Sequence, residues 1–175
     1  RILAIDLRRN LLGEIPEEFL LAYLSVRDMA VSEINDLTGY LQGRLPGPDV
    51  TAEQLRNRSW WRGPEIYLLV DDYDLVATNT SNPLAPLQPL LAQAQDIGLH
   101  LVLTRRIGGT MRAMYEPIMQ TLGDLSTPGI MLPGSPDEGP LLGRQKPQPG
   151  PAGRARLISR DGVRTLHLAW TPPTM

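Results

Sequence analysis

The stretch that decides the fold runs from Glu65 to Val76 and reads EIYLLVDDYDLV, a short apolar run that ends abruptly in two carboxylates. Such a run, with β-branched and aromatic residues, is typical of a strand buried on both faces of a sheet. Buried strands do not normally end in paired acids, because charge must stay solvated or find a partner. Ligands of open parallel sheets bind just beyond the carboxyl ends of the strands. The pattern therefore places Asp71 and Asp72 where a nucleotide-binding fold carries its Walker B acid and holds Mg²⁺.

The two acids predict different roles. Asp71 would contact Mg²⁺ through water, and Asp72 would orient the attacking water. Sites that hydrolyse nucleotides in this way usually carry glutamate at the second position, and a catalytic group misplaced by ~1 Å can lose ~10²-fold in rate. We therefore expect nucleotide binding without brisk turnover. The alternative interpretation makes the pair a helix cap and a solvated turn at a strand end.

A phosphate-binding loop, G-x-x-x-x-G-K-[S/T], is absent from the sequence. The chain's lysine, Lys146, follows no glycine cradle, and the nearest imitation, Gly134–Pro140, has proline at the lysine position. Because the chain opens directly in a strand-like run, we expect it to be a fragment. The Walker A half of the nucleotide site is then expected to precede Arg1.

Strands alternate with helices along the first two thirds of the chain, which predicts an α/β fold with a mostly parallel sheet flanked by helices. Thr51 and Gln54 form a capping box that starts a short helix. The expected strands are 1–7, 65–70 and 99–104, and the expected helices are 19–41 with a break near Ser25, 51–58, and 84–97 with Gly98 as its cap.

The last third is richer in proline and glycine. We expect a helix over 111–122, a short strand over 130–132 and a β-hairpin over 154–170 added at an edge of the sheet. Residues 133–153 predict a long flap or loop. This segment contains an acidic turn followed by apolar residues. The pattern fits a plain surface loop at least as well as a docking surface.

A second polar cluster, Thr104-Arg105-Arg106, ends the strand that follows the acid-tipped one. The Thr104 hydroxyl is placed to sense a γ-phosphate, and Arg105 or Arg106 could act in trans on the nucleotide of a neighbouring subunit. The alternative is a polar strand end with two surface arginines.

Composition excludes several classes of protein. The chain has no cysteine, so disulfides and thiolate metal sites are ruled out. A formal net charge of −2 over 175 residues provides no basic field for nucleic acid. The two histidines, His100 and His167, are too distant in sequence for metal-ligand spacing. His100 lies in an apolar strand and is expected to be a hydrogen-bonded core residue.

Several long ordered runs together resemble a known family. They are Asp71–Val76, Asn82–Leu87 and Asp96–Leu103, with further likeness in Leu45–Thr51, Arg58–Trp61 and Asp137–Gly143. In these runs the chain resembles the C-terminal ATPase module of type VII (ESX) secretion ATPases, EccC-type proteins of the FtsK/SpoIIIE group of P-loop NTPases. The resemblance spans nearly the whole chain.

The resemblance implies an FtsK/RecA-like fold, of which residues 1–175 would be the C-terminal portion. It matches Asp71 to the Walker B metal acid, Asp72 to the catalytic-acid position and Thr104 to a sensor-like strand end. The implied cofactors are ATP and Mg²⁺. ATPase activity would require the upstream Walker A half, and weak turnover is expected.

The resemblance also implies partners and a location. The last module of these ATPases docks the C-terminal export signal of an exported helical-hairpin (EsxB-like) substrate. It works with other ATPase modules and membrane subunits of the secretion complex, in ring-like oligomers on the cytoplasmic face of the cell membrane. DNA is not an expected partner, because a chain with a net charge of −2 offers no basic field for its phosphates.

Two other functions stay open at this point. The first is a nucleotide-independent peptide-binding module with a vestigial ATP site. The second is a phospho-receiver domain, which also carries paired acids after an apolar strand. A receiver needs an aspartate at the next strand end and a lysine further on. Here Thr104 ends that strand and Lys146 lies in a proline-rich loop, so the receiver is disfavoured.

Overall fold

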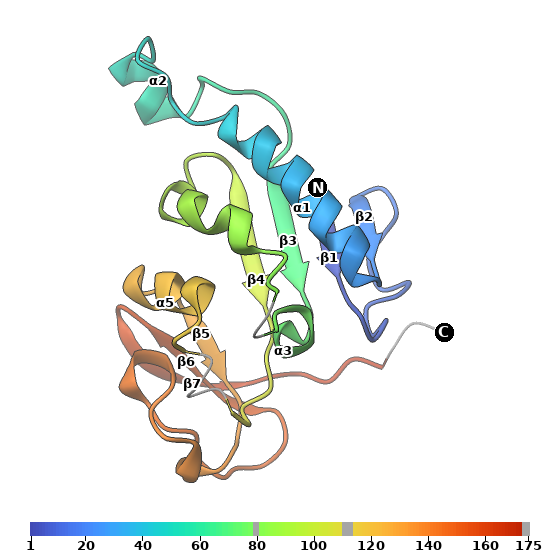
Figure 1. The fold of residues 1–175 in the computed structure, drawn as a ribbon. Coiled ribbons are helices and arrows are strands. Elements are labelled where there is room, and N and C mark those ends of the chain that lie inside the picture. The colour runs from blue at the N-terminus through green and yellow to red at the C-terminus, as the bar shows by residue number, and fades with distance from the viewer. Residues whose placement is uncertain (79–80, 110–113, 173–175) are drawn as a thin grey trace. The chain divides into compact units, whose positions relative to one another are not determined.

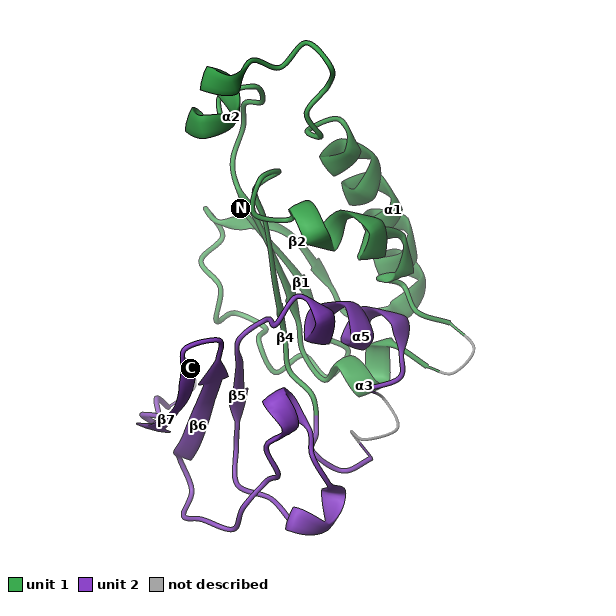
Figure 2. Cartoon of the chain, turned by 90° about the vertical axis from the view of Figure 1, so that its left-hand side faces the viewer, with its two compact units in different colours: residues 1–105 green, residues 106–175 purple. Residues whose placement is uncertain are grey.

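The computed structural model describes residues 1–78, 81–109 and 114–172, and it divides the chain into two compact units, Arg1–Arg105 and Arg106–Met175 (Figure 1, Figure 2). The first unit holds a four-stranded sheet in the order β2-β1-β3-β4. Its strands are β1 (Ile2–Ile5), β2 (Leu20–Leu24), β3 (Ile66–Val70) and β4 (Leu99–Leu103). Its helices are α1 (Arg27–Gln42), α2 (Ala52–Asn57), α3 (Tyr73–Val76) and the 3₁₀ helix η1 (Ala85–Gln93).

Every neighbouring pair of strands in this sheet is parallel. Ile5 lies beside Val70, and Val70 lies beside Leu103, so β1, β3 and β4 end level with one another. The residues that follow these strands therefore meet at one edge of the sheet. The predicted mostly parallel sheet is confirmed, and its carboxyl edge is the place where the polar residues gather.

Only one face of this sheet is covered by helices in the part of the chain that the structure describes. Leu3, Leu68 and Val70 point to that face and are fully buried. The opposite face is open, with Tyr67 41% and Val102 51% exposed. α1 runs along the covered side and packs against η1 (Figure 2). The expectation that β3 is buried on both faces is therefore wrong for the described residues.

The segment Phe19–Leu24 differs from its predicted helix. Leu20–Leu24 forms β2, which pairs in parallel with β1 and has an irregularity opposite Ile2 and Leu3. A short continuous apolar run fits a helix or a strand equally well. Here the segment forms a strand, because it pairs with the edge of β1. The helix expected from residue 84 is a 3₁₀ helix that ends at Gln93. Pro89 lies inside it and has no amide to donate to an α-helical hydrogen bond.

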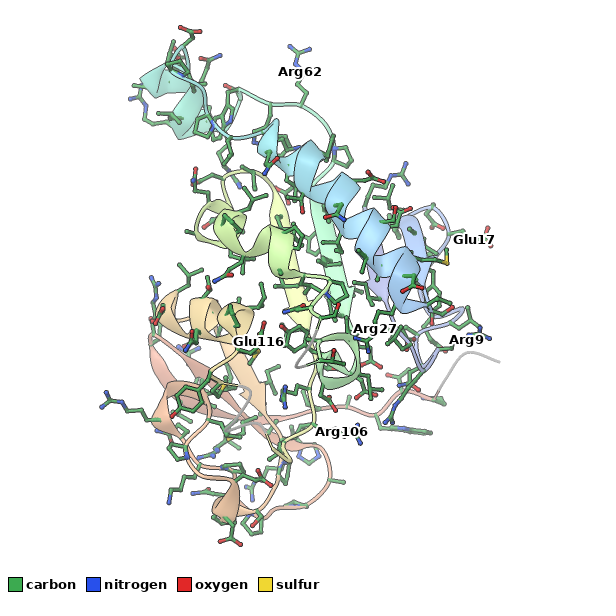
Figure 3. The ribbon with its side chains drawn as sticks, viewed as in Figure 1. Arg9, Glu17, Arg27, Arg62, Arg106 and Glu116 are labelled. Atoms are coloured by element: carbon green, nitrogen blue, oxygen red, sulfur yellow. The ribbon has the colours of Figure 1, made fainter. Side chains whose placement is uncertain are left out.

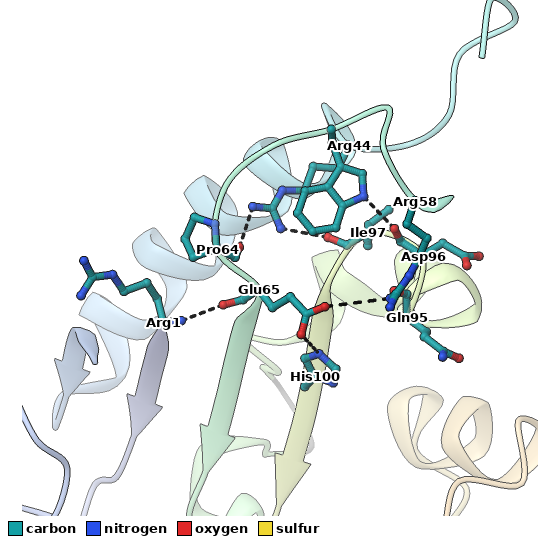
Figure 4. A network of polar contacts seen from close by, with 10 residues as sticks. Arg1, Arg44, Arg58, Pro64, Glu65, Gln95, Asp96, Ile97 and His100 are labelled. Atoms are coloured by element: carbon teal, nitrogen blue, oxygen red, sulfur yellow. Dashed lines mark hydrogen bonds and ion pairs between the residues drawn. The ribbon is translucent and has the colours of Figure 1, made fainter. Parts of the chain in front are cut away.

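The amino ends of β3 and β4 are joined by a cluster around Arg44, which is 3% exposed (Figure 4). Its guanidinium donates hydrogen bonds to the carbonyls of Pro64 (2.8 Å) and Ile97 (3.0 Å). The same group lies over the rings of Tyr40, at 4.5 Å, and Trp61, at 4.0 Å. Carbonyls and aromatic faces thus stabilise this buried charge.

The capping box is confirmed. The Thr51 hydroxyl accepts from the Gln54 amide at 3.2 Å, and the Gln54 side chain accepts from the Thr51 amide at 2.9 Å. These reciprocal bonds satisfy two amides at the start of α2, which have no partner within the helix.

The second unit has a separate antiparallel sheet. It contains α5 (Pro117–Asp124), β5 (Gly129–Met131), β6 (Arg154–Ser159), β7 (Gly162–His167) and two 3₁₀ turns, η2 (Pro136–Glu138) and η3 (Leu142–Arg144). The predicted hairpin is present as β6 and β7. Its expected place at an edge of the parallel sheet is wrong, because β6 pairs with β5.

Of the helix expected over 111–122, the structure describes α5, which ends later than predicted. Residues 111–113 of that prediction lie outside the described residues, and α5 begins at Pro117 and continues to Asp124. Proline is favoured at the first position of a helix, where its missing amide costs nothing. The Glu116 side chain caps this start by accepting from the Met119 amide at 3.1 Å.

Candidate functional site

Asp71, Asp72 and Thr104 meet at the carboxyl edge of the parallel sheet. The Thr104 hydroxyl donates to Asp71 Oδ1 at 2.7 Å and accepts from the Asp72 amide at 3.0 Å. One hydroxyl thus joins the two strand ends and orients the first carboxylate. The structure therefore brings Thr104, from the second predicted polar cluster, to the acid pair. The roles given to these three residues stay predictions.

Asp72 occupies a turn between β3 and α3 in the left-handed region, at φ 48° and ψ 58°. Aspartate tolerates this region better than most residues, but the conformation is uncommon and gathers at functional sites. Asp72 holds the N-cap position of α3, yet its side chain makes no capping hydrogen bond. The helix-cap interpretation of this side chain is therefore wrong.

α3 fixes the far side of that turn. Tyr73, its first residue, is 1% exposed, and the Asn82 side chain donates to its hydroxyl at 2.8 Å. Arg27, which opens α1, donates to the carbonyls of Leu75 and Val76 at the end of α3 (Figure 3). The acid pair therefore lies between a packed strand and a short helix whose C-terminal end is fixed by hydrogen bonds from Arg27.

A third acid, Asp6, follows β1 at the same edge and is fully buried. Its Oδ2 accepts from the Leu11 amide at 2.7 Å and from the Tyr23 hydroxyl at 2.6 Å, and its Oδ1 accepts from the Arg8 amide at 3.1 Å. Burial raises the pKa of Asp6, but the hydrogen bonds outweigh it, so the pKa lies below its ordinary value. Burial and the neighbouring Asp6 charge raise the pKa of Tyr23.

The loop that follows Asp6 reaches both members of the acid pair. Arg8 Nε lies 2.9 Å from Asp72 Oδ2, and the Asn10 side-chain amide donates to Asp71 Oδ2 at 2.9 Å. Sequence reasoning missed Asp6, Arg8 and Asn10. No local pattern marks them, because their nearness to the acids depends on β1 pairing with β3.

The carboxyl edge fits Mg²⁺ only in part. Carboxylate and hydroxyl oxygens suit this ion, which usually takes one or two carboxylates, keeps several waters and completes its shell with phosphate oxygens. No group of three or more His, Cys, Asp or Glu side chains that could hold a metal occurs among the described residues. A bound nucleotide would therefore have to supply the remaining ligands.

Other candidate residues fall outside this cluster. His100 lies 3.0 Å from Glu65 at the opposite end of β4 and stacks on Tyr67 with a ring separation of 4.3 Å (Figure 4). The expected hydrogen bond is present, but the His100 side chain is 33% exposed, so the expectation of a core residue is wrong. Arg105 follows Thr104 and is half-buried, whereas Arg106 is exposed and opens the second unit.

Comparison with known proteins adds relatives to this geometry. The chain is 45% identical over 174 residues to the ESX-4 secretion system protein EccC4 of Mycobacterium tuberculosis, covering 99% of this chain and 14% of that protein. It is similar, at 45% identity and a TM-score of 0.93, to the solved structure of Thermomonospora curvata EccC (ATPases 2 and 3) in complex with a signal sequence peptide. That match covers 99% of this chain and 31% of the solved one.

The chain belongs to the EccC family of ESX secretion proteins. The solved cytoplasmic domain of the T. curvata type VII secretion ATPase EccC also matches, with a TM-score of 0.94, 45% identity, and coverage of 99% of this chain and 20% of that one. No protein-family model matches. The chain thus spans 14% of the first curated EccC relative.

Membership of the EccC family agrees with the resemblance found in the sequence, and the parallel sheet with an added antiparallel sheet is the fold of its solved relatives. No helix of this EccC chain, within the residues the structure describes, has the length and apolar character needed to cross a membrane.

Proposed function

We propose that this chain is part of the last ATPase module of a type VII secretion ATPase. It binds ATP and Mg²⁺ at the carboxyl edge of its parallel sheet, hydrolyses ATP slowly or not at all, and docks the export signal of a secreted substrate. The observation that carries the nucleotide part is the hydroxyl of Thr104 between Asp71 and Asp72, which adjoining parallel strands bring together.

The roles follow from what each side chain offers. Asp71 would hold Mg²⁺ through water, and the ion would neutralise charge on the phosphates when bound. Thr104 fixes the rotamer of Asp71 and can exchange its hydrogen bond for one to a γ-phosphate. The upstream half of the module would supply the phosphate loop. Arg105 and Arg106 are the candidates for contact with a nucleotide held by a neighbouring subunit.

Slow turnover is supported by the state of Asp72. Its side chain is 17% exposed and faces the guanidinium of Arg8 at 2.9 Å. The ion pair directs this carboxylate toward the guanidinium, so the Oδ2 that contacts Arg8 is less free to orient an attacking water. Aspartate is also one methylene shorter than the usual glutamate, so Asp72 stands farther from an attacking water.

A fluorescent ATP analogue tests the nucleotide part in the complete protein that contains this chain. We expect a Mg²⁺-dependent signal that falls at least 10-fold in affinity with Asp71→Ala. Asp74→Ala, in the neighbouring helix turn, is the control for loss of one negative charge. A signal that is independent of Mg²⁺, or equal for Asp71→Ala and the unmodified protein, would overturn this part.

The docking part is supported by the relative that was solved with a signal sequence peptide. In this chain, a pocket of the second unit lies between the flap and the sheet β5-β6-β7. Its lining combines apolar side chains such as Leu132 with polar groups, and the exposed Arg154 suits a peptide that ends in a carboxylate. The pocket is lined by Met131, Leu132, Pro133, Gln148, Pro149, Gly150, Arg154, Ala155, Arg156 and Thr165.

Peptide titration separates this proposal from its alternative. Leu132 lines the pocket and is 48% exposed, while Val163, 46% exposed, does not line it. Leu132→Asp should weaken binding of an export-signal peptide about 10-fold, and Val163→Asp should not. Equal effects would remove the pocket from the proposal. Peptide affinity that ignores ATP, together with no nucleotide binding, would favour the nucleotide-independent module with a vestigial site.

The remaining parts of the proposal follow the family. The module would work on the cytoplasmic face of the cell membrane, in a ring-like assembly with other ATPase modules and membrane subunits of the secretion complex. The low net charge of −2 supports a protein substrate over DNA.

A further inference from the structure

The loop between β1 and β2 places one side chain on each acid of the candidate nucleotide site. Arg8 Nε lies 2.9 Å from Asp72 Oδ2, and Asn10 Nδ2 donates to Asp71 Oδ2 at 2.9 Å. Thr104 already occupies Asp71 Oδ1. Both oxygens of the predicted metal acid therefore have protein partners, and the predicted catalytic acid faces a cation.

Hydrogen bonds to Asp6 hold this loop in position. Asp6 is fully buried and accepts the backbone amides of Arg8 and Leu11 on different oxygens. Arg8 thus connects two carboxylates, since its amide binds Asp6 while its side chain binds Asp72. A buried acid thus anchors the backbone of the loop, which keeps Arg8 and Asn10 beside the acid pair.

We propose that Arg8 and Asn10 form a latch over the acid pair, a set of positioning residues that competes with Mg²⁺·nucleotide for Asp71 and Asp72. A water in a Mg²⁺ shell that donates to Asp71 would compete with Asn10 and Thr104 for the acceptor sites of this carboxylate. The positive charge of the ion also repels the Arg8 guanidinium. This inference rests on the proposed nucleotide function and adds a step that controls access to the site.

The expected size of the effect is modest. The Arg8 side chain is 47% exposed, so solvent screens its ion pair. Exposed ion pairs of this kind correspond to a change of about 2- to 5-fold in an equilibrium constant. Removal of the latch should therefore tighten Mg²⁺-dependent nucleotide binding by that factor.

The test uses the complete protein, a fluorescent ATP analogue and titration with and without Mg²⁺. Arg8→Gln should tighten Mg²⁺-dependent binding about 2- to 5-fold, and Arg8→Lys should return it toward the unmodified value. Arg9→Gln is the matched control, because it removes the same charge from an exposed residue of the same loop. A residue that only stabilises the fold would weaken binding when replaced, and would do so with or without Mg²⁺.

The outcomes separate the latch from the nucleotide function. If the unmodified protein binds nucleotide and Arg8→Gln binds no more tightly than Arg9→Gln, the latch is overturned and the function stands. If no variant binds nucleotide, the function fails, and Mn²⁺ alone then tests the latch by electron paramagnetic resonance. Tighter Mn²⁺ binding in Arg8→Gln than in Arg9→Gln would support the latch, and equal binding would overturn it.

Discussion

Two side chains at the carboxyl edge of the parallel sheet, those of Thr104 and Asp6, each form hydrogen bonds with more than one residue. Thr104 joins Asp71 to the Asp72 amide, and Asp6 anchors the loop that follows β1. The sequence predicted Thr104, because it ends an apolar strand next in order to the acid-tipped one. It did not predict Asp6, since a single acid after a four-residue strand resembles any solvated turn.

Replacement of the Thr104 hydroxyl tests the bridge. Thr104→Val keeps the shape but leaves the Asp72 amide without its partner, so the free energy of unfolding should fall by about 1 kcal/mol. Thr104→Ser keeps the hydroxyl and should lose less than half as much. Urea denaturation measures both values. Equal losses would show that the methyl group, and not the hydroxyl, stabilises this edge.

Asp6 should make stability depend on pH. Its folded-state pKa lies below the ordinary 3.8, so the ionised carboxylate stabilises the fold above that value, and this contribution is lost as pH falls through the folded-state pKa. Asp6→Asn turns one acceptor oxygen into a donor that faces a backbone amide, and should cost about 2 kcal/mol at neutral pH.

The difference in unfolding free energy between the unmodified protein and Asp6→Asn should be constant at neutral pH and narrow only below about pH 3.8. Denaturant melts at several pH values measure it. A difference that already narrows between pH 7 and pH 5 would show that Asp6 does not hold a lowered pKa.

At the scale of elements, the sequence predicted the features that depend only on residues near one another in the chain. The capping box of α2, the apolar strands β3 and β4 and the hairpin β6–β7 were predicted because each has its own residue pattern. β2 and the pairing of the hairpin were mistaken, because both depend on which strand edge lies nearby. The latch residues Arg8 and Asn10 were missed for the same reason.

The junction of η1 with β4 offers a sharp test of packing. Gly98 has φ +71°, and a Cβ there would lie 2.6 Å from the Trp61 ring. Gly98→Ala should therefore reduce the free energy of unfolding by about 2 kcal/mol or more. Gly39→Ala is the control, since Gly39 lies within α1 with open space around its Cβ position.

The control substitution should act in the opposite direction. Alanine at a helical glycine raises stability by about 0.5–1 kcal/mol. Thermal or urea denaturation measures the change in unfolding free energy of the two variants. A neutral Gly98→Ala variant would mean that the Trp61 ring, with its hydrogen bond to the Asp96 carbonyl, does not pack against this turn.

At the scale of the whole molecule, net charge predicts the class of substrate. A formal charge of −2 gives few released counterions on contact with DNA. An electrophoretic shift assay at roughly 50–200 mM salt, the range in which phosphate contacts change affinity most, should show no specific complex. A tight complex with a steep salt dependence would contradict the assignment to protein transport.

The two units also divide the proposed work. The parallel sheet of Arg1–Arg105 carries the acid pair and its latch, and Arg106–Met175 carries the flap and the pocket. Nucleotide and peptide would thus bind to different units of one chain. The sequence predicted the acid pair of the first unit, but it left residues 133–153 open between a docking surface and a plain surface loop. The location of the pocket required the pairing of β5 with β6.

A structure of the complete protein with Mg²⁺ and a non-hydrolysable ATP analogue tests the nucleotide site most directly. We predict the γ-phosphate beside Thr104 at the ends of β3 and β4, a Mg²⁺-bound water on Asp71, and Asn10 withdrawn from that carboxylate. A nucleotide bound elsewhere, with Arg8 and Asn10 still on the two acids, would contradict the assignment of this edge as the ATP site.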